Sequence, residues 1–203
     1  DNILSISNKG KPFDLDGYSS LLISNNSPKV NDSNLKGNKG LGFRSVINWA
    51  EKIIIKSANI KMTFSKEIAK NEFTKLLSNQ SVKDYYNTGN KKEGMAILAC
   101  PEIEKYSNSQ DYDTEIEIHF LEQYKSDIVN QLNSLTSLDI LFLEHTKTIE
   151  IYIDNDFKLI TKDENKTNNQ YSIVTIETEN GGTIEKEQFK VYTKNGDING
   201  NDY

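Results

Sequence analysis

The sequence is poor in the residues on which disulfide frameworks and small metal sites depend. It contains one cysteine, Cys100, and two histidines among 203 residues. A single cysteine excludes an internal disulfide and a cysteine-based structural zinc site, so we expect a reducing, cytoplasmic environment. Cys100 ends a short apolar run, which is typical of a small core residue. His119 and His145 lie far apart with no third ligand at metal spacing, so we expect both to be structural or exposed.

Long apolar runs are also absent. None approaches the ~20 residues of a membrane span, and the N-terminus lacks the charged-then-apolar pattern of a signal peptide. We therefore expect no contact with a membrane. The net charge is −6, with acidic and basic residues interspersed, which argues against direct contact with nucleic acid. The chain does not begin with Met and starts in strand-like sequence, so we expect it to be part of a longer protein.

Hydrophobic periodicity and turn residues predict mixed helices and strands up to about residue 145. We expect strands at 3–7, 52–56, 60–64, 95–99 and 114–120, helices at about 15–23, 43–50, 65–80 and 125–134, and polar loops at 25–36, 81–94 and 102–113. The short link between 52–56 and 60–64 predicts an antiparallel hairpin. Beyond His145 the pattern predicts a β meander with strands at 148–153, 157–161, 171–178 and 183–192.

One glycine-rich segment has the composition of a phosphate cradle. It reads Gly37-Asn38-Lys39-Gly40-Leu41-Gly42-Phe43-Arg44-Ser45-Val46 and leads into an apolar-periodic helix. Three glycines let the main chain approach a ligand closely, and the free N–H groups at a helix start attract anions. Alone, such a turn is equally compatible with a plain helix entry.

Two further motifs flank this segment in a defined order. A strand followed by a glycine turn, Ile6-Ser7-Asn8-Lys9-Gly10-Lys11-Pro12-Phe13, precedes it, and Tyr112-Asp113-Thr114-Glu115-Ile116 follows it. In this order the three motifs resemble the GHKL ATPase superfamily, and within it the heat-shock-chaperone-like domains of sacsin and NO VEIN type proteins. The Gly-Leu-Gly-Phe-Arg-Ser-Val run and Leu141-Phe142-Leu143 with Lys147-Thr148-Ile149-Glu150-Ile151 favour that branch. The resemblance covers roughly residues 3–153.

The resemblance implies an α+β fold. We expect a two-layer α/β sandwich of the Bergerat type with a mixed, mainly antiparallel sheet over residues 1–145. A β-rich extension, or the start of a transducer-like region, would then occupy residues 146–203.

The resemblance also implies which residues hold adenine. In such folds the turn after this first strand carries an Asp that accepts a hydrogen bond from the adenine amino group, and Asn8 occupies that position. An amide oxygen can accept the same bond, but it lacks the charge and adds donors that need partners. Gly10 would lie against the base, and Thr114 would bind the adenine or its bridging water. An ordinary strand residue remains the alternative for Thr114, and core packing is the alternative role for Phe13.

The phosphates of ATP or ADP would lie at the other end of the ligand. The segment 25–39 would form a lid, from which Lys29 could reach a phosphate or remain a solvated loop lysine. The glycine segment would wrap the phosphates through Gly37, Asn38, Lys39, Gly40, Leu41, Gly42 and Phe43. The N–H groups of Leu41, Gly42 and Phe43 would be the donors, with the Phe43 side chain in the core.

No catalytic residue and no metal ligand is assigned within the chain. In the family, the Glu that activates water and the Asn that binds Mg²⁺ lie on a helix preceding the strand with which this sequence begins. We therefore expect hydrolysis only in a longer parent protein. The Asp111 and Asp113 pair could suggest a metal or acid/base site, but its polar flanks favour a loop.

We expect an ATP-binding domain of a chaperone-like or defence-related ATPase, in which ATP with Mg²⁺ orders the lid and drives a conformational change. The implied partners are a nucleotide, the rest of a larger multidomain chain, and a second copy in a homodimer. The alternative is a degenerate, non-hydrolysing interaction module, which Asn8 motivates. A histidine-kinase catalytic domain fits less well, because the meander after residue 145 does not match that architecture.

Overall fold

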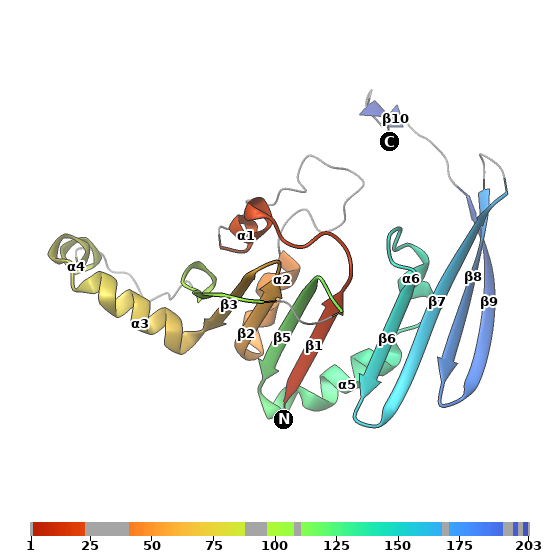
Figure 1. The fold of residues 1–203 in the computed structure, drawn as a ribbon, viewed down its shortest axis with the longest axis horizontal. Helices are drawn as coiled ribbons and strands as arrows, with labels where there is room; N and C mark the ends of the chain where they lie inside the picture. Colours follow the sequence, from red (N-terminus) through yellow and green to blue (C-terminus); the bar gives the residue numbers. More distant parts are fainter. Residues whose placement is uncertain are drawn as a thin grey trace. The chain divides into compact units, whose positions relative to one another are not determined.

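A computed structural model describes residues 2–22, 41–87, 97–107, 111–167, 171–192, 197–198 and 201–202 (Figure 1). The chain divides into two compact units, Asp1–Lys125 and Ser126–Tyr203. The sequence predicts a change from mixed helices and strands to a β meander at residue 145. In the structure, Ile140 of the helical segment before that residue belongs to the core of the second unit, together with residues of the meander.

The first unit is built around a five-stranded sheet with strand order β1-β5-β2-β3-β4. Its described elements are β1 (Ile3–Asn8), α1 (Leu15–Leu22), α2 (Leu41–Ser45), η2 (Val46–Asn48), β2 (Ala50–Ser57), β3 (Ile60–Ser65), α3 (Lys66–Leu77), α4 (Gln80–Asn87), η3 (Ile97–Ala99), β4 (Glu102–Lys105), β5 (Thr114–Phe120) and η4 (Glu122–Tyr124). All pairings between described strands are antiparallel. The expectation of a mixed sheet is therefore wrong for the described residues, whereas the α+β class is confirmed.

Alternation along the strands separates an apolar face of this sheet from a polar one. Ile53 and Ile55 of β2 are buried on the apolar face, while Lys56 points to the other. The core on the apolar face consists of Tyr18, Ile53, Ile55, Met62, Phe64, Leu98 and Ile118. Side chains of α1, α2, η2 and η3 pack against it, so one layer of short helices covers one face of the sheet.

The hairpin of β2 and β3 forms as the sequence predicts. Ser57 pairs with Ile60, and Ala58 adopts a positive φ of 50° in the turn between them. Helix α3 then begins directly after β3, because the Ser65 hydroxyl caps it by accepting the Ile68 N–H at 3.1 Å.

Four local predictions are wrong. The expected loop 81–94 contains α4, whose first turn is supported by the Asn79 side chain accepting the Ser81 N–H at 3.0 Å. The expected strand 95–99 is the 3₁₀ turn η3 over its described part, with Leu98 buried. The expected loop 102–113 contains the edge strand β4, whose four residues are all exposed, so that a polar composition is tolerated. The helix expected at 43–50 is shorter, because η2 ends at Asn48, the N–H of the following Trp49 bonds the Val46 carbonyl, and β2 begins at Ala50.

The second unit is a four-stranded antiparallel meander covered on one face by helical residues. Its strands are β6 (Thr148–Ile153), β7 (Asp156–Lys166), β8 (Tyr171–Asn180) and β9 (Thr183–Tyr192), in that order, preceded by α5 (Lys125–Ser134) and α6 (Ser137–Leu141). The predicted turn at Asn180-Gly181-Gly182 is confirmed. Both glycines have positive φ, as two-residue hairpin loops require. The short pair β10 (Asp197–Ile198) and β11 (Asn201–Asp202) follows.

Two lysines of β7 satisfy carbonyl groups at the ends of α5 and α6. The Lys158 ammonium donates to the carbonyls of Asn133, at 3.2 Å, and Leu135. The Lys162 ammonium donates to the carbonyls of Ile140, at 3.3 Å, and Leu143. The last carbonyls of a helix lack intrahelical partners and carry partial negative charge, so a cation there is favourable. The core beneath is formed by Ile140, Ile160, Val174 and Ile176.

None of the helices in the described part of the chain is long and apolar enough to cross a membrane.

Candidate functional site

Two of the three residues predicted to contact adenine are paired across the sheet, and the third follows directly. Asn8, the last residue of β1, lies opposite Thr114, the first residue of β5. Gly10 follows in the turn, and its N–H donates to the Asp113 carboxylate Oδ2 at 2.8 Å. The Asp113 N–H in turn donates to the Asn8 carbonyl at 3.1 Å. The antiparallel register thus joins two motifs that lie 103 residues apart in sequence.

Gly10 has a backbone conformation that side chains rarely adopt. Its φ is +152°, and a Cβ built on it would lie 3.8 Å from the Asn8 side-chain nitrogen. The space alone would admit a methyl group, so the backbone angle is what favours glycine here. The turn presents bare, exposed main chain beside Asn8.

A network of buried hydroxyl groups holds the Thr114 side chain in place. Ser57, the last residue of β2, is 1% exposed and Thr114 is 5% exposed, and their hydroxyl oxygens lie 2.6 Å apart. The Ser57 hydroxyl also accepts the Phe13 N–H at 3.0 Å and donates to the Asp113 carbonyl at 3.2 Å. The Tyr18 hydroxyl donates to the Ser57 carbonyl at 2.6 Å. Strands β2 and β5, the turn after β1 and helix α1 therefore meet at one group of hydrogen bonds.

The turn continues into α1 through a charged cap. Asp14 caps the helix by accepting the Gly17 N–H at 2.9 Å. The Lys11 ammonium lies 2.6 Å from the same carboxylate. The hydrogen bond from Lys11, and then that from Gly17, lower the pKa of Asp14, and the reciprocal bond raises the pKa of Lys11. Phe13 packs on Tyr18 with ring centroids 5.5 Å apart, which fits the core-packing alternative for Phe13.

Most of the predicted phosphate-binding residues lie outside the described part of the chain. These are Lys29, Gly37, Asn38, Lys39 and Gly40, together with the rest of the expected lid at 25–39. Leu41 and Gly42 are described as the first two residues of α2.

Helix α2 is held against its neighbours by two contacts. The Phe43 ring packs edge-on against Phe64 with centroids 6.3 Å apart, so its side chain lies with the core as predicted. The Arg44 guanidinium donates to the Leu21 carbonyl of α1 at 3.3 Å. These contacts fix where the glycine-rich segment enters the fold.

The polar face of the sheet carries an ion-pair cluster. The Lys56 ammonium bonds the Glu115 carboxylate at 3.0 Å and also the Glu117 carboxylate. Burial lowers the pKa of Lys56, but the bonds to Glu117 and Glu115 outweigh it and raise the pKa. The His119 Nε2 atom is buried 3.8 Å from the Glu117 carboxylate and has no hydrogen-bond partner among the described residues. Burial, and then the charge of Lys52, lower the pKa of His119.

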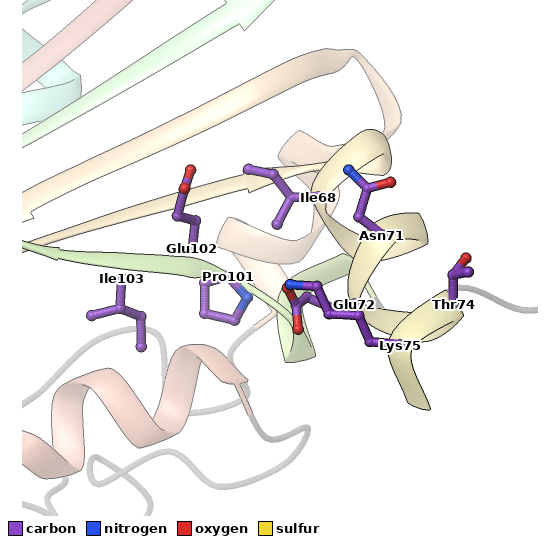
Figure 2. Close-up of a pocket in the computed structure, with 8 residues that line it drawn as sticks. All are labelled: Ile68, Asn71, Glu72, Thr74, Lys75, Pro101, Glu102 and Ile103. Carbon is purple, nitrogen blue, oxygen red and sulfur yellow. The ribbon is translucent and has the colours of Figure 1, made fainter. Parts of the chain in front are cut away.

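A cavity of about 730 Å³ lies elsewhere in the first unit, between α3 and β4 (Figure 2). It is lined by Ile68, Asn71, Glu72, Thr74, Lys75, Pro101, Glu102 and Ile103. Glu72 and Lys75 form an ion pair at 2.5 Å, so its charges are partly neutralised. The predicted site residues that the structure describes do not line this cavity.

Groups of three or more potential metal ligands are absent from the described residues. Tyr18 lies in the core and Trp49 packs against it. His145 is exposed, in agreement with the sequence.

Sequence reasoning missed two residues that hydrogen-bond with the predicted site residues Gly10 and Thr114. Ser57 was assigned only to a hairpin turn, and Asp113 was assigned to a loop. Neither carries a local signal, because their contacts with Gly10, Phe13 and Thr114 depend on the sheet register. The Asp adjacent to a predicted contact residue was the one available hint.

Comparison with known proteins returned no match: no protein-family model, no curated protein and no solved structure matches the chain.

Proposed function

We propose that the first unit binds an adenine nucleotide at the end of the sheet where β1, β2 and β5 meet. The observation that carries the proposal is the cross-strand pair of Asn8 and Thr114 with Gly10 beside it. The order of the sequence motifs predicts these three positions. The pairing of β1 with β5 places them close together.

The chemistry of the cluster suits one end of a purine. The exposed main chain at Gly10 allows a flat ring to approach without a side chain in the way. Asn8 and Thr114 add an amide and a hydroxyl, which are the polar groups that orient ligands in apolar sites. Beneath them the Ser57 network holds Thr114 in one position.

The phosphates would lie toward the glycine-rich segment that enters α2. Its described part begins at Leu41, and Phe43 and Arg44 fix α2 on β3 and α1. Mg²⁺ bound with ATP would neutralise phosphate charge, and no ligand for it is assigned among the described residues. The proposal therefore concerns nucleotide binding by this chain and assigns no hydrolytic step to it.

Calorimetric titration with ADP and ATP, with and without Mg²⁺, tests the proposal. We expect binding by the wild-type chain and at least tenfold weaker binding by Thr114→Val, which removes the hydroxyl at nearly constant shape. Thr63→Val is the matched control, because Thr63 is likewise a buried threonine of this sheet, at 8% exposure, but lies on β3. Absence of ADP and ATP binding at millimolar nucleotide, by a chain with a cooperative melting transition, would contradict the proposal.

A second candidate is a module that binds a nucleotide, or a protein partner, without hydrolysis. Asn8 favours it, because an amide replaces the carboxylate found at this position in the family that the sequence resembles. Phosphate release from ATP separates the two. Binding without release supports the module, and release that depends on Mg²⁺ supports an ATPase.

A further inference from the structure

The carboxylate of Asp113 lies at the place where the proposed site lacks a negative charge. Its Oδ2 atom accepts the Gly10 N–H at 2.8 Å. Asp113 is half-buried, and its Oδ1 atom has no hydrogen-bond partner among the described residues. One oxygen is thus used to hold the turn after β1, while the other remains available to a ligand lying on that turn.

The main chain of Asp113 is fixed on both sides. Its N–H donates to the Asn8 carbonyl at 3.1 Å, and its carbonyl accepts the Ser57 hydroxyl at 3.2 Å. With three bonds on one residue, the carboxylate is held in place before any ligand binds. Such preorganisation makes a hydrogen bond to a ligand more favourable, because less freedom is lost on binding.

The proton arrangement of the network makes Thr114 an acceptor as well. The Ser57 hydroxyl has one proton, and it donates this proton to the Asp113 carbonyl. The 2.6 Å contact between the two hydroxyls then requires Thr114 to donate to Ser57. The remaining lone pairs of Thr114 and the free oxygen of Asp113 are both acceptors on adjacent residues.

Two hydrogen-bond acceptors on adjacent residues can bind a ligand group that donates two protons. The exocyclic 6-amino group of adenine is such a group, whereas the 6-oxo group of hypoxanthine is an acceptor and would be repelled. A carboxylate is an acceptor only, while the amide of Asn8 also presents two donors. Resting on the proposed function, we infer that Asp113, and not Asn8, selects a 6-amino purine at this site.

The preference for ADP over inosine diphosphate, measured by calorimetry, tests the inference. Asp113→Asn is the sharpest variant, because the amide oxygen can still accept the Gly10 N–H while an NH₂ group replaces the free oxygen. We expect the wild-type chain to prefer ADP at least tenfold, and Asp113→Asn to lose or invert that preference. Sites built around a hydrogen bond reject analogues lacking the complementary group by such factors or more.

Two further variants separate the alternatives. Asp111→Asn is the matched control: Asp111 lies two residues away, is almost fully exposed and pairs only with Lys9, at 3.5 Å. It should keep the wild-type preference. Asn8→Ala should bind both nucleotides less tightly and keep the ratio between them. A ratio that is unchanged in Asp113→Asn, or is lost in Asn8→Ala alone, overturns the inference while leaving nucleotide binding intact.

A measurement on the wild-type chain covers the case in which Asp113→Asn does not fold. The carboxyl ¹³C resonance of Asp113 should shift on addition of ADP and respond far less to N6,N6-dimethyl-ADP, which lacks both protons. Equal shifts with the two ligands, or none with bound ADP, contradict the inference. If no nucleotide binds at all, the proposed function fails and this inference fails with it.

Discussion

At the scale of single residues, polar side chains with fixed partners dominate the end of the first sheet. Ser57 and Thr114 are small, buried and hydrogen-bonded, which is the ordinary condition for polar groups inside a protein. Asp113 differs, because one of its oxygens has no partner among the described residues. His119 differs in another way, since its Nε2 atom is buried without a hydrogen bond in the described part of the chain.

His119 predicts a specific dependence of stability on pH. Burial and the charge of Lys52 lower its pKa in the folded chain from the ordinary value of 6.5. The unfolded chain therefore binds more protons between the two pKa values, and stability falls as the pH decreases below about 6.5. We expect His119→Gln to remove this part of the pH dependence in thermal melts between pH 7.5 and 5.

The exposed His145 provides the control for that measurement. His145→Gln should reproduce the pH profile of the wild-type chain. An identical profile in His119→Gln and wild type would show that His119 titrates with an ordinary pKa in the fold.

At the scale of elements, the lysine caps of α5 and α6 link the helices to the meander. Lys162→Met keeps most of the aliphatic stem but removes the ammonium that binds the Ile140 and Leu143 carbonyls. We expect the free energy of unfolding to fall by about 1–2 kcal/mol in urea denaturation, the range for losing a charged hydrogen bond.

Lys186→Met is the matched control for this change. Lys186 lies on β9, is 63% exposed and pairs with Glu177 at 2.5 Å, and exposed ion pairs contribute little. Its replacement should change stability by less than about 0.5 kcal/mol. Equal effects of the two substitutions would contradict the capping role of Lys162.

The elements that the sequence predicts well are those with strong local signals. The hairpin of β2 and β3, the strand β5 and the meander all combine alternating apolar residues with turn residues such as Asn180-Gly181-Gly182. Strand β4 was missed because an exposed edge strand needs no apolar face. The segment containing Leu98 was misread because a short apolar run buries equally well as a 3₁₀ turn.

The candidate site also contains some residues with a local sequence signal and others without one. Asn8, Gly10 and Thr114 were predicted from the order of motifs along the chain, which is a property of sequence. The contacts that Ser57 and Asp113 make with them were not predicted, because these contacts follow from which strands are neighbours and in which register. Register is set by the burial of a whole sheet face and is not visible in any single segment.

At the scale of the whole molecule, the chain consists of two units, each with its own core. The first joins a five-stranded sheet to a layer of short helices, and the second is a meander covered by α6. All residues of the proposed adenine end belong to the first unit.

An NMR titration of the full chain with ADP tests this account most directly. The account predicts that the largest backbone amide shifts fall on Asn8, Gly10, Asp113 and Thr114. Absence of shifts at millimolar ADP would contradict it. So would shifts confined to the cavity between α3 and β4, which lies apart from these residues.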